Sequence, residues 1–410
     1  MSQSSSVEET VAWLRTPGAI RERCGQVLAA AEAGATKYFA VDNTALAGTA
    51  SYVAHVTRDA YPSLSVPAHS RWRHFSAGDV DRAALLDAAM AGQSAAHRAR
   101  VAFDLTIVSV LLDAGAGGQW TYRPSTNDCY TRSEGLAVAS FDMFRAGTFS
   151  ADQRDPLRAD AEGLARLDDT ALAEGFQVSK DNPLVGVAGR TILMRRLGQA
   201  LADRPDLFGR ERPRAGGLFD YFRATATSNA ISASAVLITL LDGLASIWPG
   251  GSHINDVPLG DVWRHPAAGD DAEGWVPFHK LSQWLTYSLI EPLERAGFEV
   301  TDIDQLTPLA EYRNGGLLID CGVLVPKNAD ILARSHEVSS DLVIEWRALT
   351  VALLDRLAPL VRAELGVDDA TFPLAKVLEG GTWRAGRQIA SEKRAGGPPP
   401  ILVAADGTVF

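Results

Sequence analysis

The chain has 410 residues, of which 46% are hydrophobic and 22% are charged. This composition is typical of a globular protein whose core is large enough for one large domain or two ordinary ones. The formal net charge is -11, and no cluster of Lys and Arg is long enough to neutralise phosphates along a nucleic acid. These properties favour a small-molecule partner and argue against nucleic acid.

The N-terminus, the most apolar segment and the cysteines all indicate a cytoplasmic protein. The chain begins with polar and acidic residues (MSQSSSVEE), whereas a signal peptide has a basic segment and an apolar core. The segment 230–248 contains Asp242 and several hydroxyl side chains, so we interpret it as a buried helix and expect no membrane partner. Cys24, Cys129 and Cys321 stand far apart without a CxxC pair, which is typical of a reducing compartment.

Helical periodicity dominates the chain. Thr16 followed by Pro17 predicts a helix N-terminus, and apolar residues then recur at helical spacing. Two further stripes of apolar residues lie in 281–293 and 351–365, and the helices that they predict end at Gly297 and Gly366. We therefore predict long amphipathic helices in both halves of the chain.

Strand signals are few. The segment 101–112 (VAFDLTIVSVLL) is rich in β-branched residues, and its pattern fits a strand as well as a buried helix. At the C-terminus, the apolar stretches 401–404 and 408–410 flank Ala405-Asp406-Gly407, which predicts a small hairpin.

These patterns predict a mainly α protein with a few short strands. The linker-like composition of 204–217 is too short to force a domain boundary. We expect a single large helical domain over 1–410, with an N-terminal helical part at about 7–200 and a C-terminal catalytic part at about 218–410.

Motifs of the large cofactor-dependent and metal-dependent enzyme classes are absent from the sequence. It contains no GxxxxGK[ST], no GxGxxG after a strand and no HExxH, and its eight histidines are scattered without ligand spacing. There is also no GxSxG nucleophile elbow. We therefore expect neither an organic cofactor nor a metal.

The segment 275–285 (WVPFHKLSQWL) carries more polar and aromatic residues than a core needs. His279 and Lys280 stand at the start of an apolar-faced helix. They are either solvated side chains or part of an anion site beside the free N–H groups of the helix N-terminus.

The segment 311–324 (EYRNGGLLIDCGVL) is the second such candidate. Glu311 is either paired with Arg313 at a helix start or a functional carboxylate beside flexible backbone at Gly315-Gly316, where a ligand can approach closely. The glycine-rich segment 378–388, with Trp383 and Arg384, is either a site that stacks a ring or binds an anion, or a structural turn. The segments 132–144, with Glu134, and 344–349 are weaker candidates, because charges beside helical apolar residues more often form a salt-bridged helix.

Almost the whole chain resembles a uracil-catabolism family of fungi and bacteria that was long catalogued as a domain of unknown function. The resemblance rests on long strings: WLRTPGAIRERC (13–24), RSEGLAVASFDMF (132–144), DVWRHPAA (261–268), GWVPFHKLSQWLTYSLIEPLE (274–294), EYRNGGLLID (311–320), EGGTWRAGR (379–387) and DGTVF (406–410). Membership implies a part in the breakdown of uracil through a ribosylurea, without implying which step.

The second half also resembles the queuosine salvage proteins, which hydrolyse the N-glycosidic bond of a modified nucleoside 5′-phosphate. FHKLSQ (278–283) and AEYR (310–313) stand at the spacing of that family's FYK-xx-Q and ADYR, and IEWR (344–347) matches its VEIR. Upstream, VAFDLTIVSVL (101–111) resembles its FVVDTLNFSFW. The resemblance implies the fold of the queuosine salvage and helical DNA-glycosylase-like proteins.

Two departures from the queuosine salvage pattern narrow the substrate. The catalytic Asp of that family is replaced by Glu311, and the aromatic NFSFW signature that sandwiches the deazapurine is lost. The resemblance therefore implies a substrate without a large flat base.

Together the two resemblances imply hydrolysis of the C1′–N bond of ribosylurea, or of its 5′-phosphate, to urea and the ribose product. By the resemblance, Glu311 stabilises or attacks the positive charge at C1′, or deprotonates an attacking water, and Lys280 is the lysine paired with it. The other candidates for contact with this ribosyl substrate, including the proton donor to urea, are His279, Arg313, Asn314, Asp104, Glu134, Trp383 and Arg384.

Two other classes of function stay open. A non-catalytic regulator or sensor of the pathway would keep the fold, although the retention of both Lys280 and Glu311 favours an enzyme. An amidohydrolase acting on the urea group would release ammonia and carbon dioxide, and it would normally need metal ligands that the sequence lacks.

Overall fold

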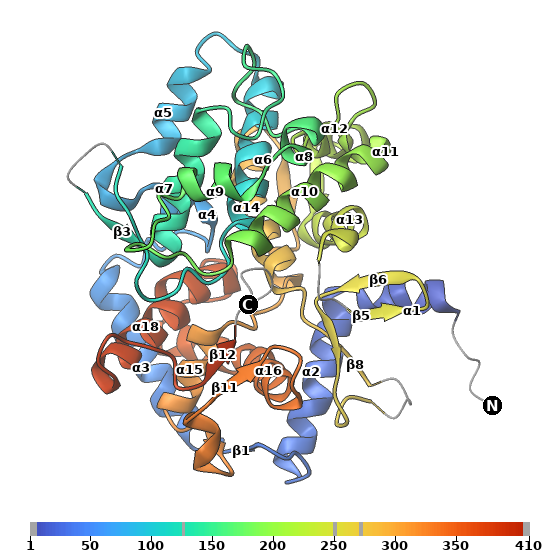
Figure 1. Ribbon diagram of the computed structural model, residues 1–410. Helices are drawn as coiled ribbons and strands as arrows, with labels where there is room; N and C mark the ends of the chain where they lie inside the picture. The colour runs from blue at the N-terminus through green and yellow to red at the C-terminus, as the bar shows by residue number, and fades with distance from the viewer. Residues whose placement is uncertain (1–5, 125–127, 249–251, 270–273, 405–410) are drawn as a thin grey trace. The chain divides into compact units, whose positions relative to one another are not determined.

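The computed structural model describes residues 6–124, 128–248, 252–269 and 274–404. Helices dominate and the strands are short (Figure 1), so the predicted mainly α class is confirmed. The described residues divide into two compact units. Unit 1 draws on 1–69, 251–283 and 302–404, and unit 2 on 70–250 and 284–301. The expectation of a single domain over 1–410 stays a prediction.

Unit 1 is built around the long helix α16 (Asp341–Leu365). α2 (Pro17–Glu32) and α3 (Ala45–Ala60) pack on α16, and α15 (Tyr312–Asp320) packs on both α16 and α18 (Trp383–Lys393). Its remaining helices are α1 (Val7–Leu14), η3 (Ile303–Gln305), η4 (Ala329–Leu332), α17 (Leu374–Lys376) and the π-helix η5 (Val377–Thr382).

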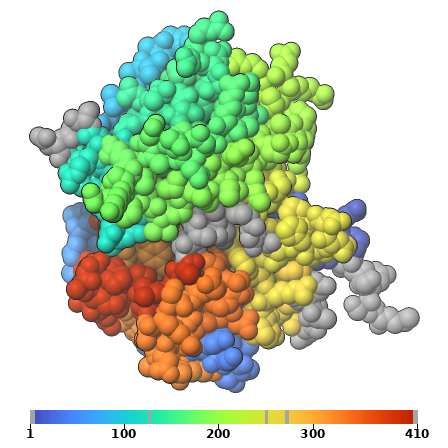
Figure 2. All heavy atoms as spheres, in the orientation of Figure 1, coloured from blue at the N-terminus to red at the C-terminus, as the bar shows by residue number. Residues whose placement is uncertain are grey.

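The strands of unit 1 form two-stranded pairs that join distant parts of the chain. β1 (Phe39–Val41) is antiparallel to β10 (Leu324–Pro326), which places N-terminal atoms, blue in Figure 2, against orange atoms of the C-terminal part. The other pairs are β5 (Ser252–Ile254) with β6 (Val257–Gly260), β7 (Val262–Arg264) with β8 (Trp275–Pro277), and β11 (Ser335–Glu337) with β12 (Leu402–Ala404).

Unit 2 is a helical body with two small strand pairs. Its helices are α4 (Arg71–Phe75), η1 (Ala77–Asp79), α5 (Arg82–Ala89), α6 (Ala95–Leu111), α7 (Arg132–Arg145), α8 (Ala161–Ala165), α9 (Asp169–Gly175), α10 (Val187–Asp203), α11 (Pro205–Phe208), α12 (Gly217–Thr225), α13 (Ala233–Leu244) and η2 (Ala245–Ile247). β2 (Thr121–Tyr122) pairs with β3 (Tyr130–Thr131), and β4 (Ala230–Ser232) with β9 (Glu299–Thr301). Helix α14 (Lys280–Arg295) contributes its first turn to unit 1 and the rest to unit 2.

The helices predicted from periodicity are confirmed. The Thr16 hydroxyl accepts a hydrogen bond from the Ala19 amide at 3.1 Å and caps α2, with Pro17 at its first position. α16 ends at Gly366, whose φ of 69° is readily adopted only without a Cβ. The ambiguous segment 101–112 is helical up to Leu111, where α6 ends. Its pattern was ambiguous because almost every side chain there is buried, and a fully buried helix shows no periodic pattern.

The predicted C-terminal hairpin stays a prediction, because its turn and second strand, 405–410, lie outside the described residues. Its first strand is observed as β12, which runs parallel to β11. The apolar segment 230–248 forms β4, α13 and η2. Among the helices of the described ranges, none has the length and the continuous apolar surface that a membrane span requires.

Candidate active site

Glu311 is the N-cap residue of α15. Its backbone is extended, and its carboxylate accepts hydrogen bonds from the amides of Arg313 (2.9 Å) and Asn314 (2.7 Å). A carboxylate fits this position because it satisfies N–H groups that the helix leaves free and interacts favourably with the positive helix end. The sequence EYRN therefore fixes a buried carboxylate, only 8% exposed, at the start of a helix.

The pKa of Glu311 is raised above its ordinary value. Burial is the largest cause, because removal from water disfavours the charged form. The two amide hydrogen bonds and the positive charges of Lys280 and Arg313 act in the opposite direction without cancelling it. The charge of Lys280 therefore limits the rise in the pKa of Glu311 but does not bring that pKa back to its ordinary value.

Lys280 begins α14 and lies close enough to Glu311 for its charge to lower the pKa of that carboxyl. Its backbone amide donates to Asp261 Oδ2 at 3.0 Å. The residue before it, His279, has a φ of 48°, which turns the chain sharply from β8 into the helix. The segments FHK and EYR, whose spacing suggested a joint site, therefore both lie in unit 1 within electrostatic reach of each other.

Asp261 and Arg347 form a buried ion pair that the sequence interpretation did not single out. Both guanidinium Nη atoms donate to the Asp261 carboxylate, at 2.8 and 2.7 Å, and Trp263 Nε1 donates to it at 2.7 Å. Burial on its own would raise the pKa of Asp261. The charge and hydrogen bonds of Arg347, with those of Trp263 and the Lys280 amide, outweigh burial and hold that pKa below its usual range.

This ion pair joins the two segments that carry the predicted catalytic residues. On one side Asp261 accepts from the Lys280 amide. On the other, Arg347 Nε donates to the carbonyl oxygen of Ala310 at 3.4 Å, directly before Glu311. The guanidinium carbon of Arg347 also lies 4.1 Å from the centre of the Phe278 ring. Hydrogen bonds therefore connect the Lys280 amide to the Ala310 carbonyl through the ion pair of Asp261 with Arg347.

His279 is buried, and its Nε2 lies 3.0 Å from the Leu14 carbonyl oxygen at the end of α1. Burial lowers its pKa to about 4, so the ring is neutral at pH 7. Nδ1 has no hydrogen-bond partner among the described residues. His279 therefore attaches α1 to the start of α14, and its neutral state makes it a weak proton donor.

Asn314 and Arg313 follow Glu311 in the first turn of α15. Asn314 Nδ2 donates to the Leu309 carbonyl at 3.3 Å, whereas its buried Oδ1 has no partner in the described part of the chain. Arg313 Nη1 donates to the Gly397 carbonyl at 2.8 Å. Asn314 thus offers an acceptor beside Glu311, while the Arg313 side chain holds the C-terminal segment.

The interpretation of Gly315-Gly316 as flexible backbone open to a ligand is wrong. Both glycines lie inside α15. A Cβ on Gly315 would meet Trp346 Nε1 at 2.6 Å, and one on Gly316 would meet Pro400 at 3.0 Å. The two glycines allow α15 to pack closely against Trp346 and Pro400, and they do not provide space for a ligand.

Trp383 and Arg384 begin α18, after the π-helix η5. The Arg384 guanidinium carbon lies 5.4 Å from the centre of the Tyr61 ring, and the Trp383 ring centre lies 6.2 Å from that of His69. His69 in turn contacts Glu379 at 2.6 Å. Both candidates thus belong to unit 1, and their contact with a substrate stays a prediction.

Asp104 and Glu134 belong to unit 2. Asp104 is fully buried in α6, where it pairs with Arg214 and accepts from the Gly216 amide at 2.5 Å. Burial raises its pKa, and Arg214 opposes that rise. Glu134 lies in the first turn of α7. Asp104 thus holds α6 to the start of α12. Substrate binding by Asp104 and by Glu134 stays a prediction.

These features describe a mainly helical protein with a buried carboxylate, a lysine acting on it and an ion pair that connects their segments. The chain matches, over residues 13–410, the family described as protein of unknown function (DUF1688), and it belongs to that family. It is 37% identical to uracil catabolism protein 4 of Lachancea kluyveri over 99% of this chain and 100% of that protein. It is 38% identical to protein urg3 of Schizosaccharomyces pombe, over 98% and 99% respectively. The predicted membership is confirmed, and the likeness to queuosine salvage proteins stays a prediction.

Proposed function

We propose that this protein is an enzyme of uracil catabolism that hydrolyses the N-glycosidic bond of ribosylurea 5′-phosphate to ribose 5-phosphate and urea. Its relative in Lachancea kluyveri is named for uracil catabolism. The observation that carries the proposal is the buried Glu311, whose pKa responds to the charge of Lys280. A carboxylate–lysine pair of this kind suits a reaction that builds positive charge on a sugar carbon.

Glu311 has two tasks in the proposed reaction. As the C1′–N bond breaks, positive charge develops on C1′ and the ring oxygen, and the carboxylate stabilises it. Glu311 also takes a proton from the water that adds to C1′, for which a raised pKa is favourable because it brings the base closer to the working pH.

The departing urea nitrogen must gain a proton. Glu311 can supply it, because it has just taken one from the attacking water and burial favours its protonated form. His279, by contrast, is neutral at pH 7, and Arg313 donates to Gly397. The balance of the reaction is then one water consumed and one urea released, with no net proton.

Lys280 and Asn314 complete the proposed site. Lys280 binds the anionic 5′-phosphate or a sugar hydroxyl, and its charge limits the rise in the pKa of Glu311. Asn314 Oδ1 accepts a hydrogen bond from a urea N–H group, which would satisfy this buried oxygen. The ion pair of Asp261 with Arg347 keeps Lys280 and Glu311 in position.

The direct test incubates the purified protein with ribosylurea 5′-phosphate and measures urea and reducing sugar. We expect one urea for each reducing sugar, no ammonia before urease is added, and the same rate with a metal chelator. Ammonia without urease would indicate an amidohydrolase instead. Tight binding of ribosylurea 5′-phosphate with no turnover would favour a sensor and reject the hydrolase.

Replacing the catalytic carboxylate should separate chemistry from folding. Glu311→Gln should lower kcat by about 10²–10⁴-fold, because the amide neither accepts the water proton nor carries negative charge. It should cost only about 1 kcal/mol of stability, since Gln keeps one cap acceptor. Glu211→Gln, at an exposed glutamate of unit 2, serves as the matched control. Unchanged turnover in Glu311→Gln would remove Glu311 from the mechanism.

A further inference from the structure

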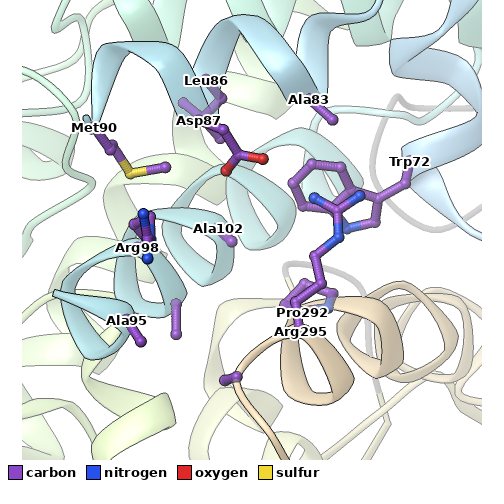
Figure 3. A pocket seen from close by; sticks show the side chains of 12 residues that line it. Trp72, Ala83, Leu86, Asp87, Met90, Ala95, Arg98, Ala102, Pro292 and Arg295 are labelled. Atoms are coloured by element: carbon purple, nitrogen blue, oxygen red, sulfur yellow. The ribbon is translucent and has the colours of Figure 1, made fainter. Parts of the chain in front are cut away.

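A pocket in unit 2 shares no residue with the candidate active site. Its volume is about 470 Å³, and α4, α5, α6 and α14 line it (Figure 3). Pockets of this size are typical of small-molecule sites. The proposed hydrolysis does not use this pocket, so its presence needs another explanation.

Part of the pocket lining is apolar and consists of small side chains. Leu86 of α5, Met90 directly after α5 and Ala99 of α6 line the pocket and are buried, and Pro292 of α14 also lines it. Ala102 and three other alanines line the same space. Larger residues at those positions would fill the hollow, so the alanines keep it open.

Trp72 is fixed at one end of the pocket. Pro292 has no N–H, so the Ser288 carbonyl oxygen lacks its usual partner within α14. Trp72 Nε1 donates to that oxygen at 3.1 Å. The guanidinium carbon of Arg295 then lies 5.1 Å from the centre of the Trp72 ring. The aromatic ring thereby holds a guanidinium at this end before any ligand binds.

Three charged side chains of the pocket have no ionic partner. Across the described ranges of the chain, no ion pair or side-chain hydrogen bond involves Asp87, Arg98 or Arg295. In the view of Figure 3 the Asp87 carboxylate lies between Arg98 and Arg295. The pocket thus presents donor, acceptor and donor in that order above an apolar surface.

The end of the pocket at Arg98 and the end at Arg295 differ in electrostatic potential. Arg98 lies in the second turn of α6, and Ala95, the first residue of α6, also lines the pocket. The positive end of a 17-residue helix adds to the guanidinium charge there and favours an anion. Arg295 is the last residue of α14, where the helix end is negative, so a neutral acceptor such as a carbonyl suits that end better.

We propose that this pocket binds a ribonucleoside 5′-monophosphate whose base carries carbonyl groups. The phosphate binds Arg98 at the start of α6, the ribose hydroxyls donate to Asp87, and the base carbonyls accept from Arg295 beside Trp72. An amino acid, with one carboxylate and one ammonium, would leave one guanidinium without a partner. The site is independent of the proposed hydrolase activity, and it provides a place where a nucleotide can regulate this protein.

Calorimetric titration of the full-length protein tests the site, with uridine 5′-monophosphate as the probe. Ribose 5-phosphate lacks the base, uridine lacks the phosphate, and adenosine 5′-monophosphate carries an amino group instead of carbonyls. We expect uridine 5′-monophosphate to bind at least about tenfold more tightly than each of these three, which corresponds to one charge-assisted hydrogen bond.

Two variants assign the ends of the pocket. Arg98→Gln should weaken both uridine 5′-monophosphate and ribose 5-phosphate about tenfold, whereas Arg295→Gln should weaken only uridine 5′-monophosphate. Arg196→Gln, at an exposed arginine of α10 outside the pocket, should change neither. Ala102→Phe should abolish binding by filling the hollow, with an unchanged melting temperature as proof of folding.

Several outcomes would overturn the proposal. They are no binding of uridine 5′-monophosphate, equal binding of adenosine 5′-monophosphate, and pocket variants that behave like Arg196→Gln. The reverse pattern for Arg98→Gln and Arg295→Gln would reject the assignment of the two ends. Tighter binding by Asp87→Ala would show that Asp87 repels the ligand instead of accepting its hydroxyls. None of these readouts depends on whether ribosylurea is a substrate.

Discussion

At the scale of single residues, opposing effects determine the pKa of Glu311. Burial favours its protonated form, while two amides and the Lys280 charge favour the ionised form. The balance leaves its pKa raised. If Glu311 must be ionised to accept a proton, kcat/KM falls as the pH drops below that pKa, and this acid limb lies at a higher pH than for an ordinary carboxyl group.

Removal of the lysine tests this balance. Because Lys280 lowers the pKa of Glu311, Lys280→Met should raise that pKa further and move the acid limb of kcat/KM to higher pH. A pH profile of both proteins measures the shift. Lys180→Met, at an exposed lysine of unit 2, should leave the limb in place. A Lys280→Met protein that is slower at every pH, with an unmoved limb, would show that Lys280 acts only in folding or binding.

The sequence predicted these two residues but not the ion pair that connects them. Lys280 and Glu311 lie in two short motifs whose spacing matches that of the queuosine salvage proteins, and such a match can be detected in the sequence. Asp261 and Arg347 are 86 residues apart, and neither forms a local pattern with its partner. The strings DVWRHPAA and IEWR contained both residues, but only the tertiary fold shows that a carboxylate in one meets a guanidinium in the other.

At the scale of secondary-structure elements, Asp261 directly before β7 and Arg347 in α16 link the beginnings of α14 and α15. Asp261→Asn would leave the buried Arg347 guanidinium without a counter-charge. We expect a loss of about 3–5 kcal/mol of unfolding free energy together with a fall in kcat. Denaturant titration and steady-state kinetics measure the two effects.

A matched control separates stability from positioning. Asp160 pairs with Arg158 in unit 2, and both side chains are buried: Asp160 is as buried as Asp261, while Arg158 is 8% exposed against 1% for Arg347. Asp160→Asn should lower stability comparably and leave kcat unchanged at a temperature where the protein is folded. If Asp261→Asn retained the kcat of the unmodified protein under those conditions, the ion pair would not position the catalytic residues.

Helix packing beside Glu311 gives a second prediction at this scale. A Cβ on Gly386 of α18 would lie 2.3 Å from the Arg313 carbonyl oxygen, so Gly386→Ala must displace backbone next to Glu311. We expect it to cost about 1–3 kcal/mol and to reduce turnover. A Cβ on Gly25 of α2 would meet nothing within 4 Å, so Gly25→Ala should stabilise the protein by about 0.5–1 kcal/mol. Thermal unfolding distinguishes the two signs, and equal effects would contradict the packing explanation.

Helices could be predicted from the sequence where one face of the helix is polar and the other is apolar. α2, α14 and α16 show apolar stripes, caps or terminal glycines in the sequence. α6 did not, because it is buried on almost every side from residue 101 onward. The parallel pairing of β12 with β11 could not be predicted either, since the two strands are far apart in the sequence and neither carries a pattern that identifies its partner.

At the scale of the whole molecule, the chain order does not follow the division into units. Unit 1 takes its N-terminal segment, a central segment and its C-terminal segment from far-apart parts of the sequence, and unit 2 takes what lies between. The amino-acid composition did not reveal the boundary between the units, because the chain passes from one unit to the other within or next to helices and strands instead of through a separate linker. α14 is the clearest case, since its residues up to 283 belong to one unit and those from 284 to the other.

This interleaving makes a prediction about fragments. The parts 7–200 and 218–410, which the sequence suggested as N-terminal and catalytic parts, should each fail to fold alone. The first would leave α2, α3 and β1 without α16 and β10, and the second would leave α16 with its apolar side exposed. Circular dichroism during urea titration should show no cooperative transition for either fragment, whereas the full chain should show one. A fragment that unfolds cooperatively would be an autonomous domain, because the contacts missing from it would then not be needed to bury its core.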